Sequence, residues 1–286
     1  MFKKELAEQA LMKAMQIRTE ANIPLVDSVC VYDFAEASGI QEIRFVAIPT
    51  LEEFYWKNEK MLIISSMRPP GRQAFNCAHG YGHHVFGHGM CITSVNETDR
   101  CFEPNEFLAE CFAGFLLMPK TAVLYGFAVR DWDIRRAKPI QIYTIANWLG
   151  VGYETLIVHM RDTLRLLSWT EANDLIKVKP ISLRSKILGE NVPGNLLVVD
   201  EYWNGRSLDI SVGDFVLLRE GIVFEGNDLE AYKKTVFGTI LTSVRTGCLG
   251  RVVNFSTGWS LPVRVSRAGY IGRNIFRFDE DTDYEC

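Results

Sequence analysis

The 286-residue sequence predicts an α+β protein whose two parts differ in secondary structure. The N-terminal part alternates helix-periodic segments with short apolar runs between Gly and Pro, which is typical of a mainly helical domain with a small sheet. After about residue 195 the pattern changes to period-two apolar runs such as NLLVVD, GIVFEG and LPVRVSR, which predict a mostly β domain. With 48% hydrophobic residues, the chain can bury a substantial core.

Periodicity and breakers define the expected elements of the N-terminal part. Pro119 ends an apolar helical segment, and the turn Gly150-Val151-Gly152 separates two helical segments in the general shape of a helix-turn-helix. In chain order we expect helices over 2–21 and 27–37, strands within 42–50 and 60–66, a histidine-rich helix after the turn 68–71, a helix over 105–118, and two helices within 142–167.

These elements predict two domains and a linker. Residues 1–170 form the first domain, which includes a helix-turn-helix-like segment at 140–168. The polar segment 171–194 is expected to be a linker, and residues 195–286 are expected to form a β-rich sensor or binding domain. The sequence contains no internal repeat and no low-complexity tract.

Composition and charge limit the class of protein. The N-terminus is charged and helix-periodic, and no apolar run approaches the roughly 20 residues that cross a bilayer, so we expect a cytoplasmic protein without a membrane partner. The seven cysteines are scattered and never form C-x-x-C, which favours reduced thiols over disulfides or a cysteine zinc site. The net charge of -4 indicates no partner at the level of the whole chain.

Four of the five histidines lie within ten residues, in the stretch FNCAHGYGHHVFGH. His79 and His83 are four positions apart, so in a helix both rings project from one face and can bind one metal ion. The alternative is that these histidines lie on the helix surface or cap the helix. The helix is otherwise apolar, which makes this alternative less favoured. His84 and His88 form a second pair of this spacing, but glycines on both sides of His88 indicate that the helix ends there, which favours surface or supporting roles.

A catalytic zinc site takes three protein ligands and a water, so the third ligand must come from another segment. In PNEFLAECFAGFLLMP, residues 104–119, Glu106 and Glu110 are four positions apart on a helix whose other face is apolar. Most carboxylates on helices are solvated, so position alone identifies neither glutamate as a ligand.

At these residues the sequence resembles the ImmA/IrrE metallopeptidases. The stretch RQAFNCAHGYGHH, 72–84, matches the family's lead into H-E-x-x-H, and EFLAECFAGFLLMP, 106–119, matches its E-x-x-A-N-x-F-A-x-x-L-L-M-P. The resemblance covers roughly residues 5–168 and does not reach the C-terminal part. It implies a zincin-like peptidase domain, with His79, His83 and Glu106 as ligands of Zn²⁺ or another divalent metal, and with Glu110 in place of the family's usual Asn.

The resemblance also implies a function in gene regulation. Members of this family cut a helix-turn-helix repressor and thereby release stress-response or mobile-element genes. A helix-turn-helix repressor is therefore the expected substrate or partner of this chain.

Gly80 stands where H-E-x-x-H has its glutamate. That glutamate takes a proton from the metal-bound water and passes it to the leaving amine, which contributes about 10²–10⁴-fold and which glycine cannot do. We expect metal and substrate binding to survive and peptidase activity to be nearly lost. Glu110 and Glu103 are alternative bases, although Glu110 should lie one turn beyond Glu106.

Two origins of Gly80 stay open. A glycine inside a helix costs about 1 kcal/mol relative to alanine. One base change converts a Glu codon to a Gly codon, which fits either a natural pseudoenzyme or a variant that arose because the active form harmed its host. Since every other residue of the motif is present, an inactivated form of an otherwise intact peptidase is favoured over a natural pseudoenzyme. The alternative function is a non-catalytic regulator that binds a repressor or nucleic acid.

For such a regulator, the helix pair within 142–167 is one candidate surface, because its shape is that of a DNA reader. The second helix carries Glu154 and Asp162 as well as Arg161 and Arg165. The acidic side chains repel DNA phosphates, so this surface is poorly suited to phosphate contact. A helix pair packed against the peptidase core is therefore favoured.

The C-terminal part offers a second candidate surface, an acid-free basic run from 245 to 278. Arginines interleaved with aromatic residues predict binding of nucleic acid or another anionic ligand. The residues are Arg245, Arg251, Arg264, Arg267, Arg273 and Arg277. The alternative places arginines on the exposed face of the strands and aromatic residues in the core, and the alternation Val263-Arg264-Val265 fits it. The acidic tail DEDTDYE, 279–285, is expected to be able to cover such a surface.

Overall fold

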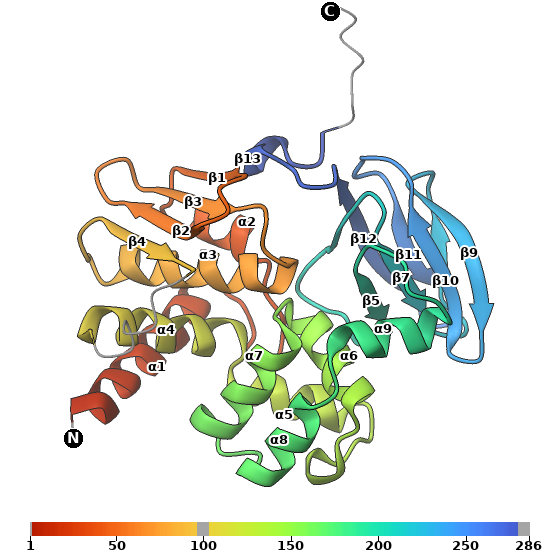
Figure 1. Cartoon of the computed structure of the whole chain (residues 1–286), viewed down its shortest axis with the longest axis horizontal. Helices are drawn as coiled ribbons and strands as arrows, with labels where there is room; N and C mark the ends of the chain where they lie inside the picture. Colours follow the sequence, from red (N-terminus) through yellow and green to blue (C-terminus); the bar gives the residue numbers. More distant parts are fainter. Residues whose placement is uncertain (1, 96–102, 280–286) are drawn as a thin grey trace, which may run out of the picture.

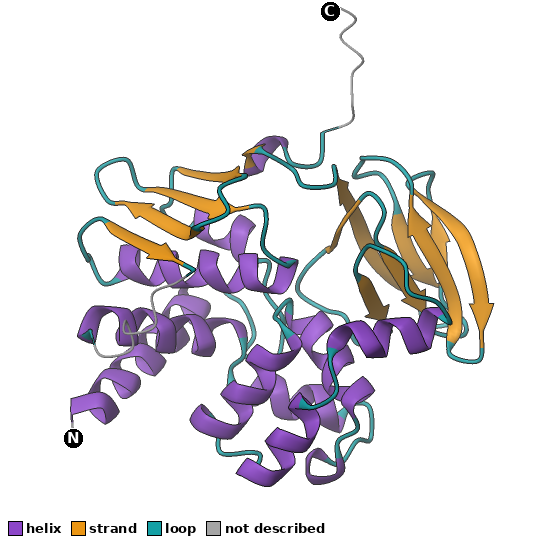
Figure 2. Ribbon diagram, in the orientation of Figure 1, coloured by secondary structure: helices purple, strands orange, loops and turns teal. Residues whose placement is uncertain are grey.

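The structure is a computed structural model that describes residues 2–95 and 103–279. It confirms the α+β fold class, with a C-terminal region of strands. Figure 1 shows a small sheet with its helices at the N-terminal end, a group of helices in the middle of the chain, and the C-terminal strands beside them. Figure 2 shows the strands in two separate groups, with most of the helices beneath and between them.

The N-terminal sheet has five strands in the order β13-β1-β3-β2-β4. They are β1 (Glu42–Val46), β2 (Leu51–Trp56), β3 (Met61–Ser65), β4 (Cys91–Ser94) and β13 (Gly272–Arg273). β1 and β3 are parallel, whereas β2 runs antiparallel to both β3 and β4. The strands predicted within 42–50 and 60–66 are confirmed as β1 and β3, while β2 and β4 were not predicted.

Helix α3 (Pro70–Val85) lies against one face of this sheet, together with the short α2 (Val31–Ala37) (Figure 1). α4 (Pro104–Leu117) packs against both α3 and α1 (Phe2–Glu20). Prolines at 69 and 70 favour the start of α3, because the first N–H groups of a helix have no partner within it. Gly87, with a positive φ of 69°, follows its last turn. The predicted histidine helix and the predicted 105–118 helix are thus confirmed.

The middle group of helices follows α4. It consists of α5 (Lys120–Ala128), a 3₁₀ turn (Ile134–Arg136), α6 (Pro139–Leu149), α7 (Tyr153–Val158) and a π-helical turn (His159–Thr163). α6 and α7 meet at Gly150, whose φ is 72°, as predicted for a pair of helices around this turn. Trp148 and Leu156, one from each helix, are fully buried. The pair therefore packs into the core, which favours the packed arrangement over a DNA reader.

Residues 171–194, the segment predicted to be a linker, are largely helical, and their role as a linker stays a prediction. They contain most of α8 (Trp169–Ile176) and all of α9 (Pro180–Leu188). Leu175, Leu183 and Leu188 are buried. Apolar side chains at these positions pack the two helices against the protein, although the segment as a whole is polar in composition.

The C-terminal strands form two four-stranded sheets, with the orders β5-β7-β10-β9 and β6-β12-β11-β8. The strands are β5 (Leu196–Val199), β6 (Leu208–Ser211), β7 (Phe215–Leu218), β8 (Val223–Glu225), β9 (Leu229–Thr235), β10 (Gly238–Ser243), β11 (Arg251–Asn254) and β12 (Trp259–Ser266). The change to period-two apolar runs after residue 195 thus corresponds to the β region that it predicts.

Several contacts connect the β region with the N-terminal part. Arg130, after α5, donates two hydrogen bonds of 2.7 Å to the carboxylate of Asp200, and both residues are buried. After β12 the chain returns to the N-terminal sheet, where β13 pairs with β1 (Figure 1). A separate domain at 195–286 stays a prediction. β13 lies within these residues but belongs to the N-terminal sheet, so the sheet contains strands from both predicted domains.

One described stretch, Pro104–Ala128, is long and apolar enough to cross a membrane by length and composition, with a mean hydropathy of 1.5. No such run was predicted from the sequence. Of its most apolar window, 67% is buried inside the protein. A buried core helix passes the same test as a membrane span, so this stretch is weak evidence for a membrane.

The described cysteines are free thiols, in agreement with the predicted reduced state. They are Cys30, Cys77, Cys91, Cys111 and Cys248. Cys101 and Cys286 lie outside the described residues.

Candidate metal centre

Helix α3 presents two histidines on one face. His79 and His83 are both buried, and their ring centroids lie 4.7 Å apart. Gly82, between them, allows α4 to come close, because a Cβ atom at this position would lie 3.1 Å from the Cα atom of Ala109. This close packing brings the first turn of α4 next to the two histidines.

Glu106 lies in that first turn. Its Oε2 is 3.5 Å from Nε2 of His79, and its Oε1 is 3.5 Å from Nε2 of His83. In the described part of the chain this is the one group of three or more His, Cys, Asp or Glu whose ligand atoms all lie within 4.8 Å of one another. Zinc bonds of about 2.0–2.1 Å at tetrahedral angles place neighbouring ligand atoms about 3.4 Å apart, so the three residues fit a zinc ion. The structure brings together the three predicted ligands, and their binding of metal stays a prediction.

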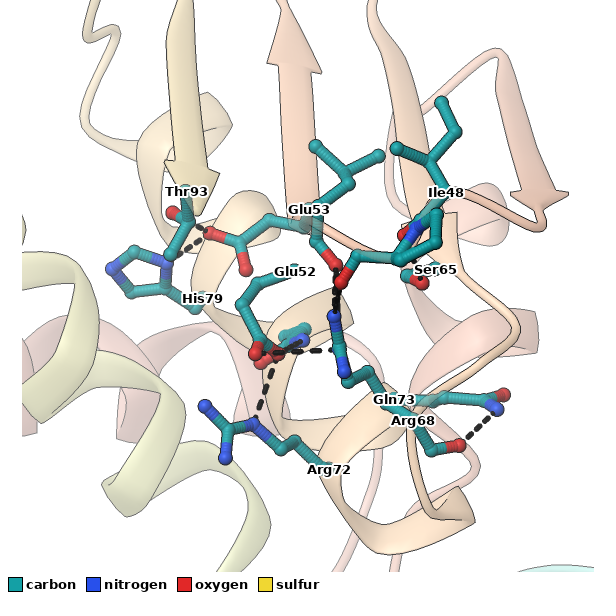
Figure 3. A network of polar contacts seen from close by, with 12 residues as sticks. Ile48, Glu52, Glu53, Ser65, Arg68, Arg72, Gln73, His79 and Thr93 are labelled. Atoms are coloured by element: carbon teal, nitrogen blue, oxygen red, sulfur yellow. Dashed lines mark hydrogen bonds and ion pairs between the residues drawn. The ribbon is translucent and has the colours of Figure 1, made fainter. Parts of the chain in front are cut away.

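Glu53, buried on β2, holds His79 from behind. Nδ1 of His79 donates a hydrogen bond of 2.6 Å to Oε1 of Glu53, and the hydroxyl of Thr93 on β4 donates to the same oxygen (Figure 3). With Nδ1 as donor, Nε2 is the nitrogen left to bind a metal on the side of Glu106. Burial by itself lowers the pKa of His79, because it disfavours the charged imidazole. The nearby carboxylates, above all that of Glu53, have the larger opposite effect, so the pKa of His79 is raised.

Replacing Glu53 is expected to weaken metal binding. For Glu53→Ala we expect a loss of about 10–100-fold in zinc affinity, because His79 loses the acceptor that fixes its ring and tautomer. Glu53→Gln keeps an oxygen acceptor without the charge and should lie between the parent and Glu53→Ala. Competition titration with a zinc chelator measures all three.

The matched control for this prediction is Glu59→Gln, in the exposed turn after β2. It should bind zinc as the parent does. Equal zinc affinity of Glu53→Ala and the parent would mean that Glu53 does not orient His79.

The neighbouring Glu52 anchors α3 to the sheet. It is only 2% exposed and accepts hydrogen bonds from Nε of Arg72 at 2.9 Å and Nδ2 of Asn76 at 2.8 Å. Nε of Arg68 lies 3.4 Å from its other carboxylate oxygen, as Figure 3 shows. The first two turns of α3 are thereby fixed to β2, and with them the orientation of the helix that carries His79.

The other two histidines of the cluster point in different directions. His84 lies with its Nδ1 2.9 Å from the hydroxyl of Tyr55, and its ring stacks on Tyr81. His88 lies behind His83, with 2.9 Å between the two Nδ1 atoms. Burial lowers the pKa of both His84 and His88, which favours neutral rings at neutral pH. These positions agree with supporting roles.

Gly80 faces the sheet and not open space. A Cβ atom at Gly80 would lie 2.5 Å from Cδ2 of Leu62, a fully buried residue of β3, and 3.7 Å from Cγ of Glu53. A side chain at position 80 therefore requires Leu62 to move. A glutamate restored at position 80 is therefore expected to carry a folding cost, because Leu62 occupies the space that its side chain needs.

The two alternative bases lie outside the ligand group. Glu110 and Glu103 are both exposed, and neither belongs to the group formed by His79, His83 and Glu106. Their use as bases stays a prediction.

The six arginines of the basic run do not share one environment. Arg267 is exposed and Arg277 is buried, and at least four of the six have carboxylate partners, so much of the charge of the run is already neutralised. The ion pairs join Arg245 to Asp228 (3.8 Å), Arg251 to Glu225 (2.7 Å), Arg264 to Asp209 (2.6 Å) and Asp33 (2.8 Å), and Arg273 to Glu42 (3.1 Å). Anion binding by all six together stays a prediction. The acidic tail from residue 280 onward lies outside the described residues.

Three residues of the site were not predicted from the sequence, namely Glu53, Thr93 and Leu62. Of these, Glu53 left a signal, because two consecutive glutamates stand in the otherwise apolar segment LEEFYW, 51–56. Acidic residues are almost never fully buried without partners, so such a pair in a strand indicates a polar contact across the sheet or helix.

The fold and the site define a class of protein. A mixed sheet covers a helix with two histidines four residues apart, and a second helix brings a glutamate to them. This arrangement is that of a metallopeptidase-like domain.

The domain matches a known family. Residues 36–160 match the family described as the IrrE N-terminal-like domain, Peptidase M78. The match covers less than half of the 286 residues, and it confirms the resemblance seen in the sequence.

Among solved structures, the chain is similar to a Mycobacterium tuberculosis transcriptional regulator. The identity is 16%, the match covers 56% of this chain and 51% of that chain, and the TM-score is 0.36. The match thus spans about half of the length of that regulator. No curated protein shows significant similarity to the chain.

Proposed function

We propose that this chain is a zinc-dependent metallopeptidase-like protein of the type that cleaves a helix-turn-helix transcriptional repressor, and that Gly80 leaves it nearly inactive as a peptidase. The observation that carries the proposal is the position of His79, His83 and Glu106, whose ligand atoms lie within 4.8 Å of one another. Three protein ligands leave a fourth position for water or substrate, as in catalytic zinc sites.

A divalent metal bound there would lower the pKa of a bound water and polarise a peptide carbonyl. His83 and Glu106 complete the ligand set with His79, whose ring Glu53 orients. Glu53 uses Oε1 for the hydrogen bond to Nδ1 of His79, on the side of the ring away from Nε2, so its role is to position the histidine.

The missing element is a base that removes the proton of the attacking water. Gly80 has no side chain, and Leu62 fills the space beside it. General acid–base catalysis contributes about 10²–10⁴-fold, so its loss should reduce cleavage by a factor of this size.

A non-catalytic regulator that binds a repressor or nucleic acid is the second candidate function. The packing of Leu62 against Gly80 favours it, because a buried aliphatic side chain occupies the region that a base would need. The two candidates differ in the expected outcome of restoring the glutamate.

The unaltered chain is expected to bind about one equivalent of zinc and to leave a helix-turn-helix repressor encoded beside its gene uncut. Metal analysis after dialysis measures the first, and incubation of the two purified proteins with zinc measures the second. Chelator-treated protein is the control. Absence of bound metal would contradict the metal site, whereas repressor cleavage that the chelator stops would show that another group acts as the base.

A further inference from the structure

Two adjoining cavities lie between the start of α3 and the C-terminal strands. Their volumes are about 420 and about 220 Å³, so the larger one has the size of a small-molecule pocket. Five lining residues belong to both cavities: Pro70, Asn195, Ser211, Asp214 and Arg277. Since Pro70 is the first residue of α3, the cavities border the helix that carries the candidate metal ligands.

Arg277 is buried at this place, and within the described residues no carboxylate forms an ion pair with it. It is 8% exposed, and its Nη1 is buried and has no hydrogen-bond partner. Its guanidinium lies 5.1, 4.8 and 5.3 Å from the ring centroids of Tyr32, Phe45 and Phe278. Within the described residues its side-chain contacts are thus aromatic rings, and no carboxylate forms an ion pair with it.

The two aspartates that line the cavities are engaged elsewhere. Asp209 accepts hydrogen bonds of 2.7 and 2.6 Å from Arg264; it also interacts electrostatically with Arg277, but no hydrogen bond or ion pair joins the two among the described residues. Asp214 accepts hydrogen bonds from two backbone N–H groups, at 2.7 and 2.9 Å. Burial raises the pKa of Asp214, which disfavours its charged form. Neither aspartate therefore supplies the anion that Arg277 lacks.

A buried guanidinium normally has an anionic partner, because removing it from water is unfavourable. Contacts with aromatic faces stabilise the charge in part, but they leave N–H donors unused. A guanidinium binds the two oxygens of a carboxylate or phosphate in a planar, bidentate manner. Ser66, Ser211, Ser266 and Tyr270 also line the larger cavity. The serine hydroxyls form hydrogen bonds to one another or to backbone carbonyls, so they add polar walls beside Arg277. These walls suit a small molecule with one anionic group and an apolar or hydroxylated body.

We propose that the cavities bind a small molecule that carries a carboxylate or a phosphate, and that Arg277 receives its anionic group. This site differs from the basic run as a whole, since the geometry selects one buried arginine out of six. A ligand bound there would contact both the C-terminal strands and the first turn of α3.

The test uses inorganic phosphate and benzoate as probes for the two anionic groups. Each is titrated into the full-length protein by calorimetry, against sodium chloride of equal ionic strength. We expect saturable binding at one site for at least one probe, and the probe that binds more tightly distinguishes a phosphate from a carboxylate ligand. Arg277→Gln should weaken this binding by about tenfold or more, because a charge-assisted hydrogen-bond pair is lost. The matched control, Arg251→Gln, removes an exposed arginine that pairs with Glu225 and should bind as the parent does.

A second variant separates binding from folding, because Arg277→Gln also removes contacts with three aromatic rings. Ala268 is exposed and lines the larger cavity, so Ala268→Trp should obstruct the cavity while Arg277 stays in place. We expect weaker probe binding with an unchanged melting temperature. The proposal is overturned if neither probe binds saturably to the parent, or if a folded Ala268→Trp and a folded Arg277→Gln both bind as the parent does.

Discussion

Gly80→Glu alone is expected to lower the stability of the protein and to leave the repressor uncut, whereas Gly80→Glu combined with Leu62→Ala is expected to gain peptidase activity. A Cβ atom at position 80 would lie 2.5 Å from Cδ2 of Leu62, inside normal contact distance. Overpacking of this kind costs about 1–3 kcal/mol, while replacing a helical glycine returns only about 1 kcal/mol or less. Shortening residue 62 removes the clash and leaves room for the carboxylate.

The gain in the double variant should reach about 10²–10⁴-fold over the parent, because this is the usual contribution of a general base. Cleavage of the repressor in the presence of zinc measures it, and a chelator should abolish it. Gly80→Gln combined with Leu62→Ala has nearly the same shape without a base and is the matched control, expected to be inactive.

Two outcomes would contradict this view of the site. If Gly80→Glu alone is as stable and as active as the double variant, Leu62 moves aside without a loss of folding free energy. If the double variant is folded and loaded with zinc but leaves the repressor uncut, the chain is a true pseudoenzyme, and the non-catalytic regulator becomes the better description.

His79→Ala is expected to abolish stoichiometric zinc binding. The substitution removes the Nε2 atom 3.5 Å from Glu106 and leaves the buried Glu53 carboxylate without its imidazole partner. With two of three ligands remaining, zinc affinity should fall by more than the about 10–100-fold expected for Glu53→Ala, since zinc sites in proteins depend on a complete ligand set. Metal analysis after dialysis and competition titration with a chelator measure the loss.

His84→Ala is the matched control for this experiment, because His84 lies on the same helix but contacts Tyr55 and Tyr81. It should retain about one equivalent of zinc. If His79→Ala retains metal with the affinity of the parent, the metal lies elsewhere and the proposed ligand set is wrong.

The sequence alone determined the fold class and the two candidate histidine ligands, for reasons that lie within single elements. A spacing of four residues in a helix places His79 and His83 on one face whatever surrounds the helix. Glu106 could be selected over Glu110 only through the family resemblance. The two glutamates are four positions apart and lie on the same face of one helix, so spacing does not distinguish them. The β region after residue 195 was recognisable because a period of two reports which side of each strand is buried.

Only the tertiary structure decided which side chains surround these residues. Glu53 reaches His79 across 26 positions of the chain, Leu62 closes the space at Gly80, and Arg277 is buried where the end of the chain returns to β1. Periodicity and spacing describe contacts within a few residues. The partner of a buried group depends on how distant segments pack against one another, and a local sequence pattern does not specify that packing.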